Sequence, residues 1–453
     1  MVAFFYLWHY PVLPNIGYCP VFHQPFVFFC IIEQSTPIVK VYSPKLFFRD
    51  TLLATVFIYA CMGVFAFFAI HLSALDPIHK ALADFDYTDL AFKIKNENSS
   101  DALLSKEIVV VELGKDRQSI AEQIQIISKH EPKVVALDAW FTNPKDPEVD
   151  LTLLSAIKGV KNFVMGAYLQ NETAEEHEEH ESEAKFHLVK SFGAFGETGT
   201  QAFVNFGGEY EKTIRYFLPQ KTADGKVVLS FTSAIMKVYD SEKYRLLSER
   251  NKEVEYINYT FSNQDFFDKK VNSPELISMG DLYSMTDAEL SEKIKNKMVL
   301  IGEVNSMSME DSHFTPYNKR LSGRSKPDMA GVLIHANILK MILQDNYVHK
   351  VPTWLIWLIS VVTTYLVVLF FSYHFVENHI WYHLYAKIFQ LVIAFVVIYI
   401  ELFLLAKLNL KFDEMAVLAP VFISVDLLYF YDAIAKFFHE RTSFNSYFMK
   451  HHH

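Results

Sequence analysis

Polar side chains that could bind a small ligand follow two of the predicted buried strands. Asp138 ends the apolar run 134–137, and Asp311 and Thr315 lie in the loop after the strand predicted over 297–302. In open α/β sheets the ligand crevice lies beyond the carboxyl ends of the strands. The sequence therefore predicts that these side chains share one edge of the sheet.

His335 and Asn337 lie in the first two turns of the next predicted helix, residues 331–343. A helix start presents unpaired N–H groups and the positive end of its dipole, which suits an anionic ligand or a carboxylate. One interpretation is a ligand pocket made of the polar residues Asp138, Asp311, Thr315, His335 and Asn337. The other is a buried Asp–His–Asn network that fixes the loop to the helix. The second is favoured because a helix packed on a sheet buries most of its residues.

These residues make a weak case for catalysis or for a metal site. The sequence contains no G-x-S-x-G elbow, no H-E-x-x-H motif and no glycine-rich phosphate loop between a strand and a helix. His313 and His335 could in principle bind zinc with Asp311, but their spacing defines no known ligand set. We therefore assign no catalytic residue, metal or cofactor. A hydrolase that uses Asp138, Asp311 and His335 is the least favoured alternative.

The charged residues are concentrated in one central segment of the 453-residue chain. Residues 73–350 hold 43 acidic and 33 basic side chains and the remainder holds nine of each, so the net charge of −10 belongs to this segment. No basic stripe is present to neutralise phosphates, which excludes a nucleic-acid binder. The cysteines all precede the segment, so it contains neither a disulfide framework nor a cysteine-based zinc site.

Four apolar runs flank the central segment, and each has about the 20 residues that a membrane-spanning helix needs. They cover residues 52–72, 353–375, 386–406 and 415–431. We therefore expect a first transmembrane helix within residues 45–72, three more within 351–435, and a short cytoplasmic tail over 436–453. The lipid bilayer is thus one partner of the chain.

Basic residues around the spans predict their orientation. Lys45 and Arg49 precede the first span, and Lys436 and Arg441 follow the last, which places both ends of the chain in the cytoplasm by the positive-inside rule. A basic loop containing Lys411, between the third and fourth spans, disagrees weakly. We expect a multi-pass protein of the bacterial inner membrane whose large acidic domain faces the periplasm.

The central segment has the pattern of an alternating α/β domain. Continuous apolar runs predict strands buried on both faces over residues 107–113, 134–138, 163–169 and 297–302. Helices are predicted between the first three strands, over 118–130 and 151–157, which gives βαβ units in a mixed sheet. Residues 202–206 and 213–217 flank Gly207-Gly208 and predict an antiparallel hairpin. The expected fold is this α/β domain plus an α-helical membrane region of four spans.

Two late motifs are the most specific in the chain, namely Asp311-Ser-His-Phe-Thr-Pro316 and Gly331-Val-Leu-Ile-His-Ala-Asn337. Together with weaker matches along residues 73–350, they resemble the type-two CHASE family of extracellular sensor domains. The family's usual layout, with one span before the domain and three after it, also fits. Family members often continue into a kinase or cyclase, whereas only about 20 residues follow Tyr431 here. The resemblance therefore implies a stand-alone sensor domain without its own output domain.

We expect a non-catalytic membrane protein whose extracytoplasmic domain binds a small ligand or an envelope partner. It would relay the signal through its helices to a separate protein. The alternative is a structural or accessory subunit of a larger membrane complex, with no ligand.

Two acidic residues lie within the predicted spans, Glu401 in the third and Asp426 in the fourth. A carboxylate in hydrocarbon costs a few kcal/mol, so it usually faces a partner or a cavity. One interpretation is a contact with another membrane subunit, which would build a hetero-complex or homo-oligomer through the C-terminal spans. The other is a neutral carboxyl that bonds Tyr or Ser within the bundle.

Two further segments have no role that a motif defines. Residues 1–44 are rich in aromatic residues and prolines, which predicts a membrane-surface arm or a poorly ordered tail. Residues 172–183 are acidic and contain histidines. We expect a solvated loop there, because like charges at this density repel one another.

Overall fold

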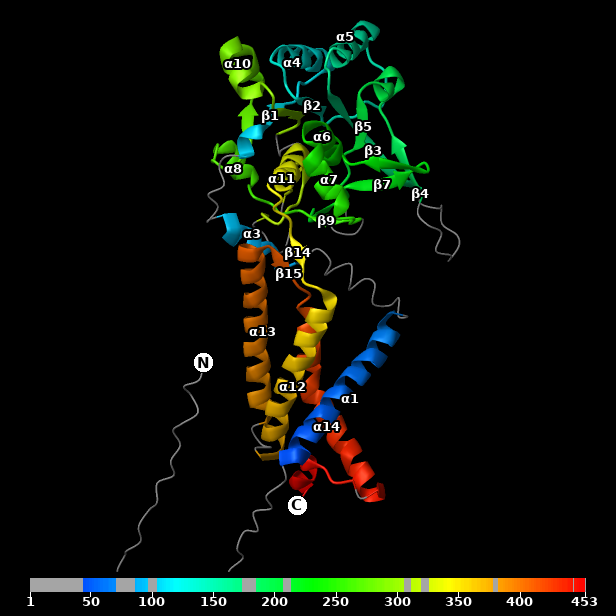
Figure 1. Ribbon diagram of the computed structural model, residues 1–453, viewed down its shortest axis with the longest axis vertical. Coiled ribbons are helices and arrows are strands. Elements are labelled where there is room, and N and C mark those ends of the chain that lie inside the picture. The colour runs from blue at the N-terminus through cyan, green and yellow to red at the C-terminus, as the bar shows by residue number, and fades with distance from the viewer. Residues whose placement is uncertain are drawn as a thin grey trace, which may run out of the picture. The chain divides into compact units, whose positions relative to one another are not determined.

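The structure is a computed structural model that describes residues 44–70, 86–96, 104–172, 185–206, 213–304, 311–318, 326–377, 382–442 and 444–452 (Figure 1). The predicted N-terminal arm (1–44) and acidic loop (172–183) lie almost wholly outside these ranges. The described chain comprises an α/β domain and four long apolar helices, which confirms the predicted fold class.

A mixed sheet forms the centre of the α/β domain, with strand order β10-β1-β11-β2-β3-β4 and with β5 paired to β3. Its strands are β1 (Ile108–Glu112), β2 (Val134–Leu137), β3 (Phe163–Glu172), β4 (Lys185–Val189), β5 (Thr200–Phe203), β10 (Glu275–Ile277) and β11 (Met298–Gly302). All pairs are parallel except β3 with β4. Because β11 inserts between β1 and β2, strands that are distant in sequence end side by side.

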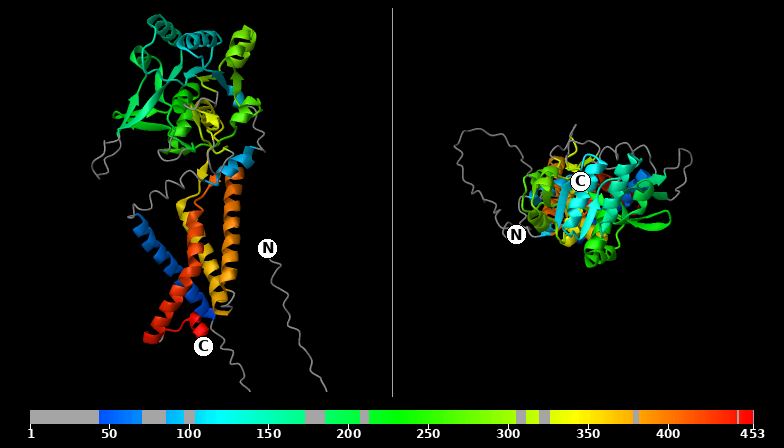
Figure 2. Two further views of the ribbon diagram at one scale, coloured as in Figure 1. Left: turned by 180° about the vertical axis from the view of Figure 1, so that it is seen from behind. Right: turned by 90° about the horizontal axis from the view of Figure 1, so that it is seen from above.

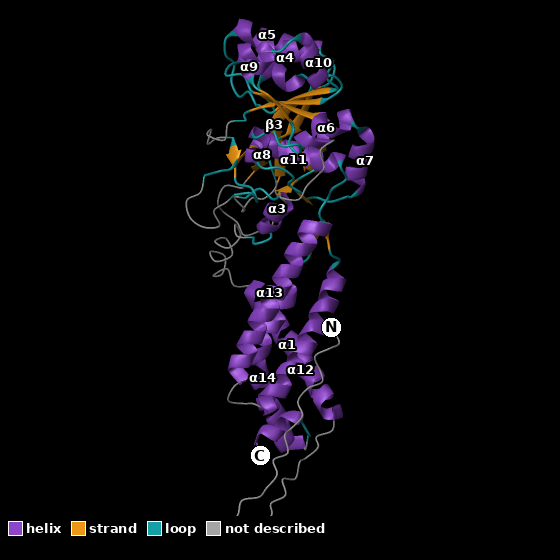
Figure 3. Cartoon of the chain, turned by 90° about the vertical axis from the view of Figure 1, so that its left-hand side faces the viewer, coloured by secondary structure: helices purple, strands orange, loops and turns teal. Residues whose placement is uncertain are grey.

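Side chains alternate between the two faces of the sheet, as strand geometry requires. In β1, Val109 and Val111 enter one hydrophobic core, whereas Ile108 and Val110 enter the other. Helices α4 (Arg117–Lys129), α5 (Pro147–Lys158), α9 (Met279–Ser284) and α10 (Asp287–Ile294) cover the first core. Helices α6 (Phe231–Tyr239), α7 (Ser241–Glu249), α8 (Asn263–Phe267) and α11 (Gly331–Leu343) cover the second (Figure 3). Burial on both faces explains the continuous apolar strands.

Local capping fixes where the helices begin. Asp116 accepts a hydrogen bond from the Ser119 backbone N–H at 2.8 Å and so caps α4. Asp146 caps α5, whose first residue is Pro147, a residue that suits a first helical turn. Helix α11 has no side-chain cap, and the N–H of its first residue, Gly331, instead donates to the Asp311 carbonyl at 3.0 Å.

The predicted hairpin over residues 202–206 and 213–217 is wrong. Strand β5 pairs in parallel with β3, and β6 (Tyr216–Phe217) pairs antiparallel with β9 (Glu255–Tyr256). Ala202 and Phe203 are buried in the central sheet, so tertiary packing overrides the local turn signal. A hairpin does form between β7 (Gln220–Ala223) and β8 (Lys226–Leu229). Its turn residues Asp224 and Gly225 have φ of 52° and 71°, which is typical of Asp-Gly in a tight hairpin.

Short elements connect these layers. They are α3 (Asp89–Asn96), β12 (Ser312–His313), β13 (Met329–Ala330), β14 (His349–Lys350), β15 (Leu410–Lys411) and the 3-10 turns Leu104–Glu107, Gly193–Glu197 and Tyr447–His452. Strands β12 and β13 pair antiparallel and lead into α11. Strands β14 and β15 pair in parallel, with His349 opposite Leu410.

Four helices in the described chain are long and apolar enough to cross a membrane. They are α1 (Pro44–Ile70), α12 (Thr353–Glu377), α13 (Tyr382–Leu408) and α14 (Met415–Thr442) (Figure 2). Helices α1, α12 and α14 pack on one another around a shared apolar cluster. Each predicted span falls within one of these helices, except that the first extends two residues past α1.

Polar contacts inside the bundle repair the backbone of α14 at Pro420. A proline has no N–H, so the Ala416 carbonyl lacks its usual partner within the helix. The Ser360 hydroxyl of α12 donates to that carbonyl at 2.6 Å. The Gln390 amide of α13 donates to the Val421 carbonyl at 3.0 Å. Since lipid offers no hydrogen bonds, these contacts allow the proline within the span.

Contacts at the helix ends define the two ends of the helix bundle. The Tyr447 backbone N–H donates to Asp50 of α1 at 2.6 Å, so the C-terminal residues meet the start of the first span. At the other end, the α13–α14 loop is held to the α/β domain by the β14–β15 pairing. The start of α1 and the C-terminal residues therefore lie at the same end of the helix bundle.

Candidate functional site

Polar residues gather where the ends of β2 and β11 meet the start of α11, the position of the ligand crevice in open α/β sheets. A Cβ atom added to Gly331 would lie 3.8 Å from Asp138 Oδ2, 3.6 Å from His313 Nε2 and 3.8 Å from the Asp311 carbonyl oxygen. Gly302 at the end of β11 is in close approach to α11, since an added Cβ would lie 2.7 Å from Val332. The glycine at position 302 therefore allows the helix start to approach the strand end, whereas at position 331 an added Cβ would make only ordinary contacts. We refer to Asp138, Asp311, His313 and His335 as the crevice residues.

The electrostatics of the crevice centre on Asp138. Burial and, to a smaller extent, the negative charge of Asp311 together raise the pKa of Asp138 to about 7. Asp138 stays partly exposed and makes no hydrogen bond through its carboxyl to any other described residue. This carboxyl therefore changes protonation near neutral pH and can both donate and accept a hydrogen bond.

The two crevice histidines are neutral. Burial and, to a smaller extent, nearby His313 together lower the pKa of His335 to about 3. Burial also lowers the pKa of His313, and Asp311 only partly opposes this. His335 packs against Phe206 and Phe231, with ring centroids 4.6 Å and 5.0 Å apart. Its Nδ1 is buried and has no hydrogen-bond partner among the described residues.

Asn337 has a structural role, and both polar atoms of its side chain are hydrogen-bonded. Its Oδ1 accepts from the Thr260 N–H at 2.9 Å and the Phe261 N–H at 3.3 Å. Its Nδ2 donates to the Phe261 carbonyl at 3.2 Å and to the Leu333 carbonyl at 3.1 Å. Asn337 therefore fastens α11 to the segment after β9.

Thr315 also has a structural role, because its hydrogen bonds stabilise the loop that contains it. Its hydroxyl donates to Asp328 at 2.5 Å and its backbone N–H donates to the same carboxylate at 2.9 Å. Asp311 is exposed and contacts α11 through its carbonyl, which accepts from Gly331. Of the predicted ligand residues, the structure thus brings Asp138 and Asp311 together and places His335 beside His313. Thr315 and Asn337 form separate contacts. His313, which lies two residues after Asp311, was not among the predicted ligand residues.

The described part of the chain offers no metal centre. No group of three or more His, Cys, Asp or Glu side chains there is arranged to hold a metal ion. The crevice instead combines one titrating carboxyl, neutral imidazoles and the Phe206 ring. This combination suits a small ligand that donates hydrogen bonds or carries positive charge.

A second polar cluster joins the α/β domain to the membrane helices, and we call it the junction. Its members are Asp86, Tyr87, Asp89, Lys95, Arg215, Asn258, Asn346, Glu401, Asn409 and Lys411. Lys411, in the α13–α14 loop, lies 2.9 Å from Asp86. Arg215 of the domain binds both carboxylate oxygens of Asp89 at the start of α3, at 3.0 Å and 2.8 Å.

The junction also accounts for Glu401. This side chain is fully buried and accepts a hydrogen bond from the Tyr87 hydroxyl, so it has a partner within the chain. Burial and the adjacent Glu401 raise the pKa of Tyr87, which keeps the hydroxyl a donor. Asp426 differs, because it is exposed on α14 and has no hydrogen bond or ion pair among the described residues.

The comparisons with known proteins give one family. No curated protein and no solved structure is significantly similar to the chain. A family model described as the CHASE2 domain matches residues 65–376, which is more than half of the chain. The match includes both late motifs, the crevice and helix α12. The chain therefore belongs to the CHASE2 family of sensor domains.

Proposed function

We propose that the chain is a membrane sensor in which the crevice binds a small extracytoplasmic ligand and α11 carries the change to the membrane helices. The observation that carries this proposal is the position of α11 in the chain. Its first residue, Gly331, borders the crevice, and the residues after its end enter the junction through Asn346 and β14. A helix of this length spans about 20 Å.

Helix α11 is suited to transmit a displacement as one piece. Every one of its residues is buried, and it packs against both the sheet and α6. Packed helices respond to strain by discrete shifts, because protein interiors are close-packed. A shift of α11 would act directly on β14, which continues into α12 and pairs with the α13–α14 loop.

The proposed ligand is small and either positively charged or a hydrogen-bond donor. Asp138 and Asp311 supply negative charge, and the neutral histidines supply acceptor nitrogens. A ligand of this kind would bind better when Asp138 is ionised. If the ligand binds one conformation of the domain more tightly than the other, this difference in affinity would drive the conformational change.

We further propose that the domain lies in the periplasm of a bacterium, with the chain in the inner membrane. Lys45 and Arg49 at the start of α1 share one end of the bundle with the C-terminal residues, which favours that end as cytoplasmic. Lys411, which argued against this orientation, is ion-paired to Asp86 of the domain side. Its charge is therefore explained by the junction.

Hydrogen exchange of the full chain in nanodiscs tests the relay. Asp138→Asn removes the crevice charge, and we expect it to change amide exchange in residues 349–351 and 409–411 at least threefold. Asp287→Asn is the matched control, because the Asp287 side chain is 98% exposed and lies outside the crevice. Exchange changes confined to the strands around residue 138 would overturn the relay.

A second candidate function is an accessory subunit of a membrane complex with no ligand. The exposed position of Asp426 on α14 favours it, since an unpaired carboxyl facing lipid is costly. Purification in a mild detergent separates the two candidates. A stoichiometric membrane partner together with an Asp138→Asn variant that behaves like the wild type would support the accessory subunit.

A further inference from the structure

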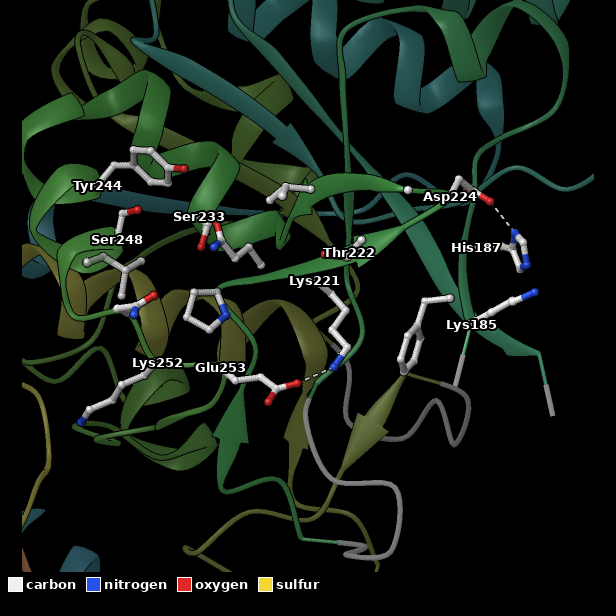
Figure 4. A pocket seen from close by; sticks show the side chains of 17 residues that line it. Lys185, His187, Lys221, Thr222, Asp224, Ser233, Tyr244, Ser248, Lys252 and Glu253 are labelled. Atoms are coloured by element: carbon white, nitrogen blue, oxygen red, sulfur yellow. Dashed lines mark hydrogen bonds and ion pairs between the residues drawn. The ribbon is translucent and has the colours of Figure 1, made fainter. Parts of the chain in front are cut away.

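A groove of about 940 Å³ lies on the α/β domain, away from both the crevice and the junction. One wall is formed by β4 and by the β7–β8 hairpin. The other is formed by α7 and by the residues that follow it, 251–253 (Figure 4). Leu247 and Ser233, both buried, contribute to its floor. A cleft of this size is in the usual range for small-molecule sites.

Several polar groups line the groove without partners inside the described chain. The hydroxyls of Thr222, Tyr244 and Ser248 and the side-chain amide of Asn251 make no hydrogen bond to any other described residue. Thr222 lies on β7, whereas Tyr244 and Ser248 lie on α7, in the opposite wall of the groove (Figure 4). A ligand with several hydroxyl groups could bond to all of them at once.

The groove is locally cationic, although the domain around it is acidic. Three lysines line it, Lys185, Lys221 and Lys252, against two carboxylates, Asp224 and Glu253. Lys185 has no ion-pair partner among the described residues.

The positive charge of Lys252 is not required to neutralise the adjacent carboxylate of Glu255. It lies 3.6 Å from Glu255, but that carboxylate already binds Arg250 through two hydrogen bonds, of 2.5 Å and 3.1 Å. Glu255 is thus neutralised without Lys252. Nearly two-fifths of the Lys252 side chain is exposed at the groove.

An ion pair crosses from one wall of the groove to the other. Lys221 of β7 lies 2.5 Å from Glu253, whose side chain is 69% exposed. The Lys221 side chain is only 23% exposed, but water screens the exposed Glu253 carboxylate, so a ligand anion can replace Glu253 beside Lys221. Lys221 also lies 4.9 Å from the centre of the Phe186 ring, which presents an apolar face next to the charge.

We propose that this groove binds an anionic carbohydrate, meaning a sugar that bears carboxylate or phosphate groups. Lys221 and Lys252 recognise the charge, and Thr222, Ser248 and Tyr244 bond to sugar hydroxyls. The site is separate from the crevice, so the proposal does not depend on the relay through α11.

The test uses the full chain in nanodiscs and four defined probes. Trigalacturonate and glucose 6-phosphate carry the charge, and maltotriose and glucose are their uncharged counterparts. We expect at least one charged probe to bind at least tenfold more tightly than its uncharged counterpart by calorimetry. The double variant Lys221→Gln/Lys252→Gln should weaken that binding at least tenfold.

Lys161→Gln is the control variant, because it removes one lysine charge at an exposed position outside the groove. It should bind the charged probe as the wild type does. Failure of both charged probes to bind the wild type at millimolar concentration would overturn the proposal. Equal binding by the double variant with unchanged thermal unfolding would also overturn it.

Discussion

Lys411 in the loop between the last two membrane helices forms an ion pair of 2.9 Å with Asp86, just before α3 of the sensor domain. The pair fastens the α13–α14 hairpin to the domain, next to the Tyr87–Glu401 hydrogen bond. Lys411 also lies 4.8 Å from the centre of the Tyr256 ring. A basic residue that looks misplaced by the positive-inside rule is thus part of a structural contact.

Breaking this pair should destabilise the junction. Lys411→Met leaves Asp86 in a site where its side chain is only 23% exposed, and we expect unfolding of the full chain to cost about 1–3 kcal/mol less. The double variant Asp86→Asn/Lys411→Met should regain part of the loss, since no charge is then left unpaired. Thermal unfolding in nanodiscs measures the two single variants, Asp86→Asn and Lys411→Met, and the double variant. A loss of stability in the double variant that equals the sum of the two single losses would contradict the pairing.

The same pair gives a pH dependence of known sign. Burial alone would raise the pKa of Asp86, but the charge and hydrogen bond of Lys411 outweigh burial and lower it below the ordinary 3.8. The pair therefore contributes its full stability above that value and loses it as the pH falls through the lowered pKa. Unfolding followed from pH 5 to below pH 3 should show a loss, beginning below about pH 4, in the wild type that Asp86→Asn lacks.

Asp138 should behave in the opposite way. Because its pKa in the folded state is about 7, the folded chain holds a proton that the unfolded chain releases near pH 4. Ionisation of Asp138 therefore costs stability as the pH rises from about 4 to 7. We expect Asp138→Asn to stabilise the domain by about 2–4 kcal/mol at pH 8 and by almost nothing at pH 4. Equal effects at both values would show that the carboxyl titrates normally.

Asn337 and His335 should respond differently to the same substitution. Asn337→Leu removes a side chain that bonds four backbone groups, and we expect a loss of about 2–4 kcal/mol. His335→Leu removes a neutral ring with an unpartnered Nδ1, so the loss should stay below about 1.5 kcal/mol. Thermal unfolding of the two variants side by side compares them. A larger loss for His335→Leu would mean that His335 is the main structural contact.

Asp426 should matter for assembly and not for folding. Asp426→Leu should leave the domain folded but shift the chain toward smaller species in native mass spectrometry from mild detergent. Phe422→Leu is a suitable control, because Phe422 is also exposed on α14 but carries no charge. A chain that is monomeric before and after the substitution would rule out a membrane partner at this position.

The elements of this fold were predictable from local pattern, because burial on both sheet faces leaves continuous apolar strands such as 108–112. The predicted ends of α11 agree with the structure for the same reason, since all but three of its residues are apolar or glycine. The pairing of the strands was less predictable. The hairpin predicted at Gly207-Gly208 is wrong because β5 pairs within the central sheet, whereas Asp224-Gly225, a strong turn signal, does join the two strands of a hairpin.

The site was predictable only in part. Asp138 and Asp311 follow strands that end at the same edge, which topology alone implies. The roles of Asn337 and Thr315 depend on partners at residues 260–261 and 328, and no local pattern links these positions. The junction and the groove were missed for the same reason, since their residues come from segments far apart in the sequence.

The central claim is that a change at the crevice reaches the α13–α14 loop. The most direct test is a distance measurement between spin labels at exposed positions 287 and 413, in a cysteine-free chain in nanodiscs. Titration from pH 5.5 to pH 8.5 ionises Asp138, and we predict a shift in the distance distribution that Asp138→Asn abolishes. A distance distribution that does not change with pH in the wild type would contradict the relay from the crevice to the α13–α14 loop. A pH-dependent shift that persists in Asp138→Asn would also contradict it.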